Sequence, residues 1–193
     1  MNLLQMAGIL LILGFALVLI ASFVGPNGVY TAPDNATRME IIAQNQGRWK
    51  ATNLIWAFGS LATASGMLLI TLGLRKDGNT ILLYLAATVF SIGSVAWAVY
   101  AFQRIGDPEG NLYTTPPAPL SLVFAYATIV GLALYGLAFL LGSYPNWLGY
   151  ILLVAMGLLT TGLIFFFDRI YAFFPPQFFN LLTLIIGIVA IRR

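Results

Sequence analysis

The sequence predicts an all-α polytopic membrane protein, with six transmembrane helices in one bundle. Of its 193 residues, 60% are hydrophobic and only 8% are charged, whereas a soluble domain carries about 25% charged residues. Its mean hydropathy is +0.92. Apolar stretches long enough to cross roughly 30 Å of hydrocarbon recur along the chain. The alternation typical of barrel strands is missing, so we expect these stretches to be helices.

The predicted spans make up a single domain over residues 1–193. The first apolar run lacks a positively charged leading segment. It is about 22 residues long, against roughly 7–15 for the core of a signal peptide, so we expect a retained transmembrane helix. The last span is the shortest and ends at Arg192–Arg193, which would anchor it at the membrane interface. In chain order, the spans are expected at residues 3–24, 51–74, 80–102, 120–141, 147–167 and 175–191.

The connections between these spans alternate in length. Those at 25–50, 103–119 and 168–174 would lie on one side of the membrane, and the short turns 75–79 and 142–146 on the other. Counting Lys and Arg gives five on the first side and four on the second, which does not decide the orientation. Because those four lie in very short segments, we expect both termini to be cytoplasmic and the membrane to be the bacterial cytoplasmic membrane.

The stretch FFFDRIYAFFPP at residues 165–176 places one pair of opposite charges among aromatic side chains. Asp168 comes about 21 residues after Trp147, which is roughly 31 Å along a helix and therefore one bilayer thickness. We expect Asp168–Arg169 to lie where the fifth span leaves the bilayer, rather than as a buried functional pair. No acidic or basic residue falls in the middle third of any predicted span.

The first long connection predicts a short amphipathic helix within ATRMEIIAQNQGRW, residues 36–49. Met39, Ile42 and Trp49 would lie near one face, with mostly charged and amide side chains on the other. Gly47 would end this helix. We expect it to lie in the membrane interface, anchored by Trp49. The alternative is a lid over a central pocket.

Small residues recur at helical spacing in three of the spans, and such stripes mark close approaches between helices in lipid. We expect the spans 51–74 and 80–102 to form a tight antiparallel hairpin, with 120–141 close by. A groove for a cofactor is the alternative. The predicted helix-packing residues are Gly59, Ala62, Gly66, Gly73, Ala87, Ser91, Ser94, Ala98, Gly131 and Ala138.

Cysteine and histidine are absent from the chain, which excludes disulfides, thiolate metal sites and histidine ligands for haem or zinc. No phosphate-binding loop, dinucleotide fingerprint or hydrolase motif occurs. We therefore predict no catalytic residue, no cofactor and no metal. Asp107 and Glu109 form a pair of carboxylates, but the Pro-Gly turn around them favours solvated loop charges. A lipid-modifying enzyme that uses Asp168 or Glu40 stays open, and the net charge of +3 does not indicate nucleic acid binding.

After the fourth predicted span the chain reads YPNWLGYILLVAMG. With its six predicted spans and long first connection, it resembles a family of small uncharacterised bacterial membrane proteins that is defined only as a domain of unknown function. The fifth helix of that family often follows a Pro-x-Trp-Leu-Gly start. The resemblance covers the topology of most of the chain, rests on one five-residue motif, and implies no activity.

Two functions remain open. Small-residue stripes, aromatic belts and uncharged helix centres favour a non-enzymatic accessory or scaffold subunit, packed against membrane lipids, another integral membrane protein or further copies of itself. The alternative is a small-solute-binding or transport component. The long connections on one face are similar to those of the substrate-capturing subunits of energy-coupling-factor vitamin transporters. By that analogy the ligand-binding candidates at this face are Arg38, Glu40, Trp49, Arg104, Asp168 and Arg169.

Overall fold

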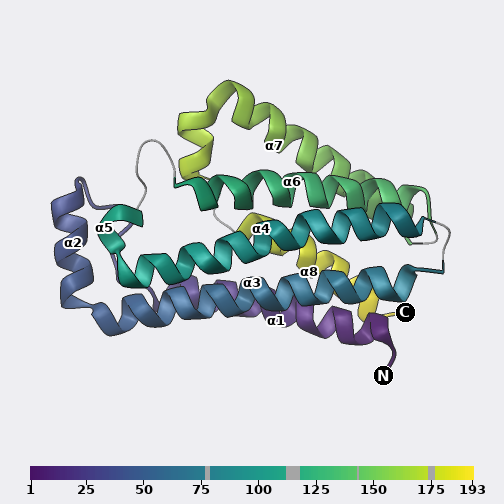
Figure 1. Ribbon diagram of the computed structural model, residues 1–193, viewed down its shortest axis with the longest axis horizontal. Helices are drawn as coiled ribbons and strands as arrows, with labels where there is room; N and C mark the ends of the chain where they lie inside the picture. The colour runs from purple at the N-terminus through teal and green to yellow at the C-terminus, as the bar shows by residue number, and fades with distance from the viewer. Residues whose placement is uncertain (77–78, 112–117, 143, 174–176) are drawn as a thin grey trace.

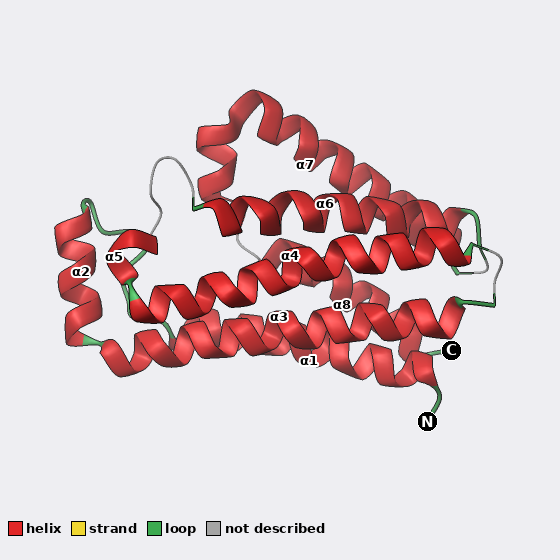
Figure 2. Cartoon of the chain, viewed as in Figure 1, coloured by secondary structure: helices red, strands yellow, loops and turns green. Residues whose placement is uncertain are grey.

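The computed structural model describes residues 1–76, 79–111, 118–142, 144–173 and 177–193, and the side chains of 166–173 and 177 lie outside that description. Within these residues the chain forms eight helices and no strand (Figure 2). They are α1 (Leu3–Val24), α2 (Asn35–Gln44), α3 (Gln46–Leu74), α4 (Thr80–Gly106), α5 (Pro108–Asn111), α6 (Pro119–Leu140), α7 (Asn146–Phe173) and α8 (Gln177–Ile191).

Five described helices are long and apolar enough to cross a membrane: α1, α3, α4, α6 and the part of α7 that ends at Phe165. The shorter α8 has 15 residues. Three helices extend beyond their predicted bounds: α3 begins at Gln46 instead of residue 51, α4 continues to Gly106 instead of residue 102, and α7 continues to Phe173 instead of residue 167. Charged and polar residues at the ends of the apolar runs also adopt helical backbone. The helices therefore extend past the apolar runs from which their bounds were predicted.

Consecutive long helices run antiparallel, and both chain termini lie at one end of the molecule (Figure 1). Along the bundle, α8 packs against α1 and α3, α1 against α3, α3 against α4, α4 against α6, and α6 against α7. The short helices α2 and α5 lie together at the opposite end. We call this end, with α2, α5 and residues 25–34, the loop end, and the other the terminal end.

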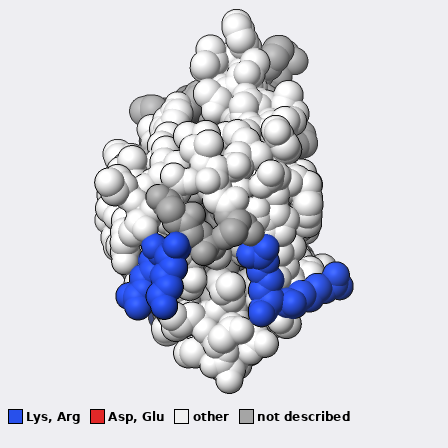
Figure 3. Space-filling view, turned by 90° about the vertical axis from the view of Figure 1, so that its right-hand side faces the viewer, with Lys and Arg blue, Asp and Glu red and all other residues white. Residues whose placement is uncertain are grey.

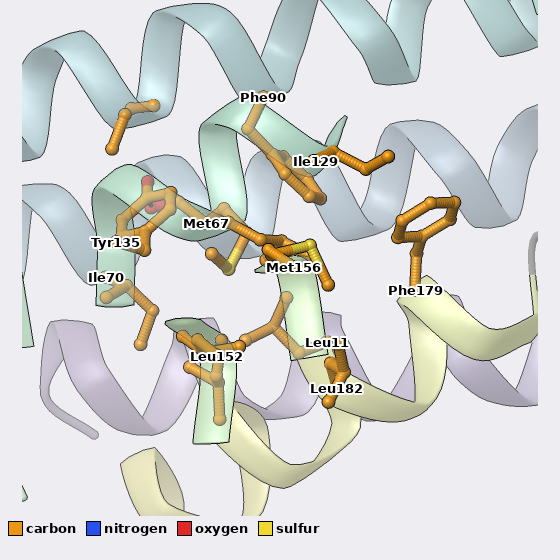
Figure 4. Packing of buried hydrophobic residues seen from close by; sticks show 14 of the residues in the cluster. Leu11, Met67, Ile70, Phe90, Ile129, Tyr135, Leu152, Met156, Phe179 and Leu182 are labelled. Atoms are coloured by element: carbon orange, nitrogen blue, oxygen red, sulfur yellow. Dashed lines mark hydrogen bonds between the residues drawn. The ribbon is translucent and has the colours of Figure 1, made fainter. Parts of the chain in front are cut away.

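The five long helices and α8 all contribute to one buried apolar cluster. Near its centre, Leu11 of α1 and Met67 of α3 lie close to Met156 of α7 and Leu182 of α8 (Figure 4). Phe90 and Ile129 join the cluster from α4 and α6 (Figure 4). Because the faces that point away from this cluster are also apolar, the surface matches hydrocarbon better than water.

Gly59, Gly66 and Gly73 of α3 face α1, and this differs from the predicted α3–α4 hairpin seam. A Cβ at Gly66 would come within 2.7 Å of Leu11, and one at Gly59 would lie 3.1 Å from the carbonyl oxygen of Gly14. Gly73 likewise meets Leu4 of α1. The stripe was expected to fit α4, but α3 carries small residues on more than one face, and its glycines are the ones that allow the approach of α1.

The seam between α3 and α4 uses other small residues. Ala98 and Ala101 of α4 pack with Ala57 of α3, and the hydroxyl of Ser60 donates to the carbonyl oxygen of Ser94 at 2.9 Å. On the next seam, Gly131 of α6 lies against the backbone of α4 at Phe90. Of the other predicted packing residues, Ala87 and Ala138 are buried, and Ala62 and Ser91 are half-buried.

Hydrogen bonds between helices reinforce the core. The Tyr135 hydroxyl donates to the carbonyl oxygen of Met67 at 2.8 Å and lies 2.8 Å from the Thr71 hydroxyl, so it links α6 to α3. Thr63 of α3 donates to Asn180 of α8 at 3.0 Å. Such bonds contribute about 0.6 kcal/mol each on average within a membrane.

The first connection folds differently from the predicted helix at 36–49. Asp34 caps α2 by accepting from the backbone N–H of Thr37 at 2.7 Å, and this bond holds the pKa of the Asp34 carboxyl below its usual range. The break between helices falls at Asn45, and Gly47 lies inside α3. Trp49 therefore belongs to the first turn of α3, where it is 1% exposed instead of anchored in the interface.

Candidate functional site

Arg104 is the most buried charged side chain described in the bundle, with 1% of its surface exposed. It lies in the last turn of α4. That helix has 27 residues, or roughly 40 Å, so its end extends past a hydrocarbon core of roughly 30 Å. Arg104 thus lies at the loop end, and a helix of this length is long enough to carry its last turn to the level of the lipid headgroups.

Four aromatic rings surround its guanidinium carbon. The ring centroids lie 4.6 Å away for Trp49, 5.2 Å for Trp56, 5.6 Å for Tyr100 and 5.8 Å for Tyr30. We call these four residues and Arg104 the Arg104 cage. Each distance falls within the range of cation–π attraction, which reaches about 2 kcal/mol where the cation is desolvated.

Helical spacing explains how three elements supply the cage. Trp49 and Trp56 are seven residues apart in α3 and therefore share one face, and Tyr100 precedes Arg104 by one turn of α4. Tyr30 comes from the connection between α1 and α2. The indole N–H of Trp49 donates to the backbone carbonyl oxygen of Arg104 at 2.9 Å, which fixes the end of α4 against α3.

The polar contacts leave the cation incompletely bonded. Nη2 of Arg104 donates to the hydroxyl of Tyr30 at 3.0 Å, whereas its Nε is buried without a hydrogen-bond acceptor. No carboxylate among the described side chains forms an ion pair with Arg104. A buried cation is normally paired with an anion. Among the described residues, the charge of Arg104 is instead compensated by ring faces and one phenol oxygen.

Other buried polar atoms beside the cage also lack partners. The indole nitrogens of Trp56 and Trp97 have no acceptor, and these two rings lie 5.9 Å apart. On the same stretch of α3, Oδ1 of Asn53 and Oγ1 of Thr52 are likewise unbonded. More than nine in ten buried polar groups in proteins have a partner, so this group of unsatisfied atoms indicates a place for a ligand or water.

The segment that covers the cage is held at several points. Val29 and Ile42 pack with Trp49 in a small apolar cluster, and the guanidinium of Arg48 donates to the carbonyl oxygens of Val24 and Gly25 at 3.0 and 2.9 Å. Gly28 has a φ of +82°, a conformation that favours glycine. Tyr30 follows two residues later and keeps 41% of its surface exposed, so it connects Arg104 with the outside.

The structure brings together two of the six predicted ligand-binding residues, Trp49 and Arg104. Arg38 donates instead to Asn35 and to the carbonyl oxygen of Ala32. The carboxylate of Glu40 accepts from the amide of Gln44 at 3.1 Å, so both residues bond within or next to α2. The predictions for Asp168 and Arg169 concern side chains outside the described residues; their backbone lies within α7.

Sequence reasoning missed the other cage residues, Tyr30, Trp56 and Tyr100. The local signals were present, because Trp-x₆-Trp and Tyr-x₃-Arg each place two side chains on one helical face. Neither pattern shows that the two faces meet.

A second feature is an apolar groove of about 610 Å³ on the outside of the bundle, between α7 and α8. It is lined by Tyr150, Ile151, Val154, Ala155, Leu158, Leu159 and Phe178.

Comparison with protein families, with curated proteins and with solved structures finds no match for this chain.

Proposed function

We propose that the protein crosses the membrane six times, with α8 as the sixth crossing and α2 in the loop-end interface. A helix of 15 residues is roughly 22 Å long, short of a hydrocarbon core of roughly 30 Å. The extended side chains of Arg192 and Arg193 can make up part of this difference by reaching toward the headgroups. The position of Leu182 and Ile186 in the common core supports a helix that runs through the bundle instead of along its surface.

The distribution of charge supports an orientation with both termini in the cytoplasm. Arg75, Lys76, Arg192 and Arg193 are exposed, and basic side chains gather in two groups on the terminal end, where no acidic group of the described residues is in view (Figure 3). Cytoplasmic segments are enriched in Lys and Arg. The chain has no cysteine, so a single cysteine at Asn2 or Glu40 can be labelled from one side in intact cells. If a reagent outside the cell labels the Asn2→Cys variant, the N-terminus is extracellular and the proposed orientation is wrong.

We infer that the protein acts as a non-enzymatic binding component for a small solute, and that its site is the Arg104 cage at the loop end. The observation that carries this function is the burial of Arg104 without a carboxylate partner among the described side chains. A buried charge without an anionic partner is costly, so a fold that retains one favours a functional role for it. The cage therefore favours the solute-binding alternative over the accessory role that the small-residue stripes suggest.

The test is a thermal-shift screen of purified protein against anionic, neutral and cationic small molecules. A ligand that binds only the folded protein raises its melting temperature. We expect at least one ligand to stabilise the wild type, and the Arg104→Gln variant to lose that stabilisation. Lys50→Gln is the matched control, because it removes one exposed positive charge from the same end. If no member of a broad panel stabilises the wild type, the proposed function is wrong.

An accessory role stays as the second candidate, supported by the outer face of α7. Tyr150, Val154 and Leu158 form a ridge at four-residue spacing and are 61–69% exposed, and the same three side chains line one side of the apolar groove. Ridges of this spacing fit grooves of another helix. The occupant that we propose is an apolar transmembrane helix of a membrane partner. Purification in mild detergent would test it: a Val154→Trp variant should lose a partner that the wild type retains.

A further inference from the structure

We infer that the Arg104 cage binds an oxyanion, a phosphate or a carboxylate group, in the place that the hydroxyl of Tyr30 occupies in this structure. The inference rests on the proposed binding function and adds the chemical class of the ligand. It follows from the geometry of one edge of the guanidinium.

Nε and Nη2 of an arginine project their N–H bonds side by side, and this pair matches two oxygens of one carboxylate or phosphate. At Arg104 one donor of this pair is used and the other is not. Nη2 donates to Tyr30 at 3.0 Å, and the neighbouring Nε has no acceptor. A single phenol oxygen satisfies half of the fork. An oxyanion has two oxygens in the right relation and satisfies both donors.

The charge and the other unpaired atoms point to the same class of ligand. The indole nitrogens of Trp56 and Trp97 are donors only, and both lack an acceptor. A cationic ligand would be repelled by Arg104. An anion is attracted by the positive charge of Arg104, which no described carboxylate neutralises. Its hydrogen bonds to the guanidinium are charge-assisted and therefore roughly twice as strong as neutral ones.

Tyr30 is the group that such an anion would displace. It lies on a connection, not on a transmembrane helix, and it is the most exposed member of the cage at 41%. Its movement leaves α3 and α4 in place, because Trp49 fixes these two helices through the carbonyl oxygen of Arg104. Tyr30 therefore competes with the ligand, and its hydroxyl sets the affinity.

Two sources can supply this chemistry at headgroup depth: a soluble anion that approaches from the loop end, or the phosphate of an anionic lipid. The reporter for both is intrinsic fluorescence in a Trp147→Phe background. Trp147 lies at the start of α7, near the terminal end (Figure 1). Its removal leaves Trp49, Trp56 and Trp97, which are all in the cage or in ring contact with it.

In the first arm, the protein in phosphatidylcholine nanodiscs is titrated with sodium phosphate or sodium acetate, and with sodium chloride at matched ionic strength. In the second arm, the phosphatidylcholine is replaced stepwise by phosphatidylglycerol. We expect a saturable change in one arm and none with chloride. A response only to the soluble anions identifies a solute site, and a response only to phosphatidylglycerol identifies a headgroup site.

The decisive variant is Tyr30→Phe, which keeps the ring and removes the competing hydroxyl. Because the anion no longer has to replace a hydrogen bond to the charged guanidinium, the dissociation constant should fall roughly tenfold or more. Arg104→Lys keeps the positive charge but removes the parallel pair of N–H donors, and it should raise the dissociation constant by a similar factor. Lys50→Gln should leave it unchanged. Because Tyr30→Phe retains the buried cation and all the rings, its result does not depend on a variant that fails to fold.

The inference fails separately from the proposed function. If Tyr30→Phe leaves the affinity for the anion unchanged or lowers it, the oxyanion does not replace the phenol. If the thermal-shift screen finds only neutral or cationic ligands that depend on Arg104, the protein binds solutes but the ligand class is wrong. If the thermal-shift screen finds no stabilising ligand, the proposed function itself is wrong.

Discussion

Replacing Gly131 by alanine tests whether the seam between α4 and α6 is as close as the structure indicates. A Cβ at this position would lie 2.8 Å from N, Cα and Cβ of Phe90. These are backbone atoms and the first side-chain atom, so no change of rotamer relieves the contact. The helices themselves must separate.

The size of the effect follows from two opposing terms. Ordinary contacts of a Cβ begin at 3.4 Å, so the seam must open by 0.6 Å, the difference between 3.4 and 2.8 Å, to restore an ordinary contact. A gap of about 0.5–1 Å forfeits a quarter to a half of the dispersion energy of the atoms that it separates. Overpacking costs about 1–3 kcal/mol, and a rigid backbone contact lies at the upper end of that range. Alanine regains about 1 kcal/mol of helix propensity, so we expect a net loss of about 2 kcal/mol.

Gly157→Ala is the matched control. A Cβ at Gly157 meets nothing within 4 Å, so the same substitution should leave the free energy of unfolding unchanged or raise it by up to about 1 kcal/mol. Both variants are unfolded by titration with sodium dodecyl sulfate in mixed micelles, with tryptophan fluorescence as the signal. If Gly131→Ala is as stable as the wild type, α6 does not approach α4 in this way.

Two further predictions concern single hydrogen bonds. Tyr135→Phe removes the hydroxyl that bonds α6 to α3, and in the same assay it should lower the free energy of unfolding by about 0.6 kcal/mol, and by no more than about 1.7 kcal/mol. Because the bond from Thr37 lowers the pKa of Asp34, this carboxylate stabilises α2 above its usual pKa of about 3.9, and the contribution is lost as the pH falls through the lower folded-state value. Protection of the α2 amides from hydrogen exchange should fall in that acidic range in the wild type, and should already be low at neutral pH in Asp34→Ala. Equal protection of the two proteins at neutral pH would contradict the cap.

The transmembrane helices could be predicted because a single physical constraint determines them. A backbone in hydrocarbon must satisfy its own hydrogen bonds, and the bilayer sets the length. The bounds of α1 therefore follow from composition alone. The start of α3 was placed too late and the end of α4 too early, because a polar residue was taken as the limit of a helix. At headgroup depth polarity does not end a helix, and α4 continues until the Gly106-Asp107-Pro108 sequence.

The partner of each packing stripe could not be predicted in the same way. The seven-residue spacing of Gly59, Gly66 and Gly73 predicts a close contact with another helix. It does not indicate which helix that is. In the structure the seam belongs to α1. The contact with α4 uses Ala57 and Ser60 on another face of α3. Only the three-dimensional arrangement distinguishes these faces, because both carry small residues.

The Arg104 cage could be predicted only in part, for a related reason. The sequence predicted that Trp49 and Arg104 would lie at the same end of the protein, which followed from the alternation of long and short connections. It did not predict their contact. That contact brings together residues 55 positions apart, and the ring of Tyr30 comes from a third element. No local pattern carries information about such distant pairs.

The burial of Arg104 does not conflict with the prediction that the helix centres are uncharged, because Arg104 lies in the last turn of α4. A charge at the bilayer midplane is shielded from water by lipid, and no movement of the protein's loops exposes it. Arg104 is near a helix end, and its cover includes Tyr30, α2 and the other residues of the first connection. The part of the desolvation that Tyr30 supplies therefore belongs to that cover, whereas Trp49, Trp56 and Tyr100 supply the rest from α3 and α4.

This separation has a consequence for how substitutions should behave. Changes on the helix seams, such as Gly131→Ala, alter the stability of the bundle and should leave the affinity of the cage unchanged in whatever fraction stays folded. Changes in the cover, such as Tyr30→Phe, alter the balance between the closed cage and a bound anion. They should leave unfolding of the bundle nearly unaffected, because the bond from Trp49 to the carbonyl oxygen of Arg104 remains. If both kinds of substitution changed stability and affinity together, the cover and the bundle would be one cooperative unit, and Arg104 would be better explained as an anchor that locks the loop end to α4.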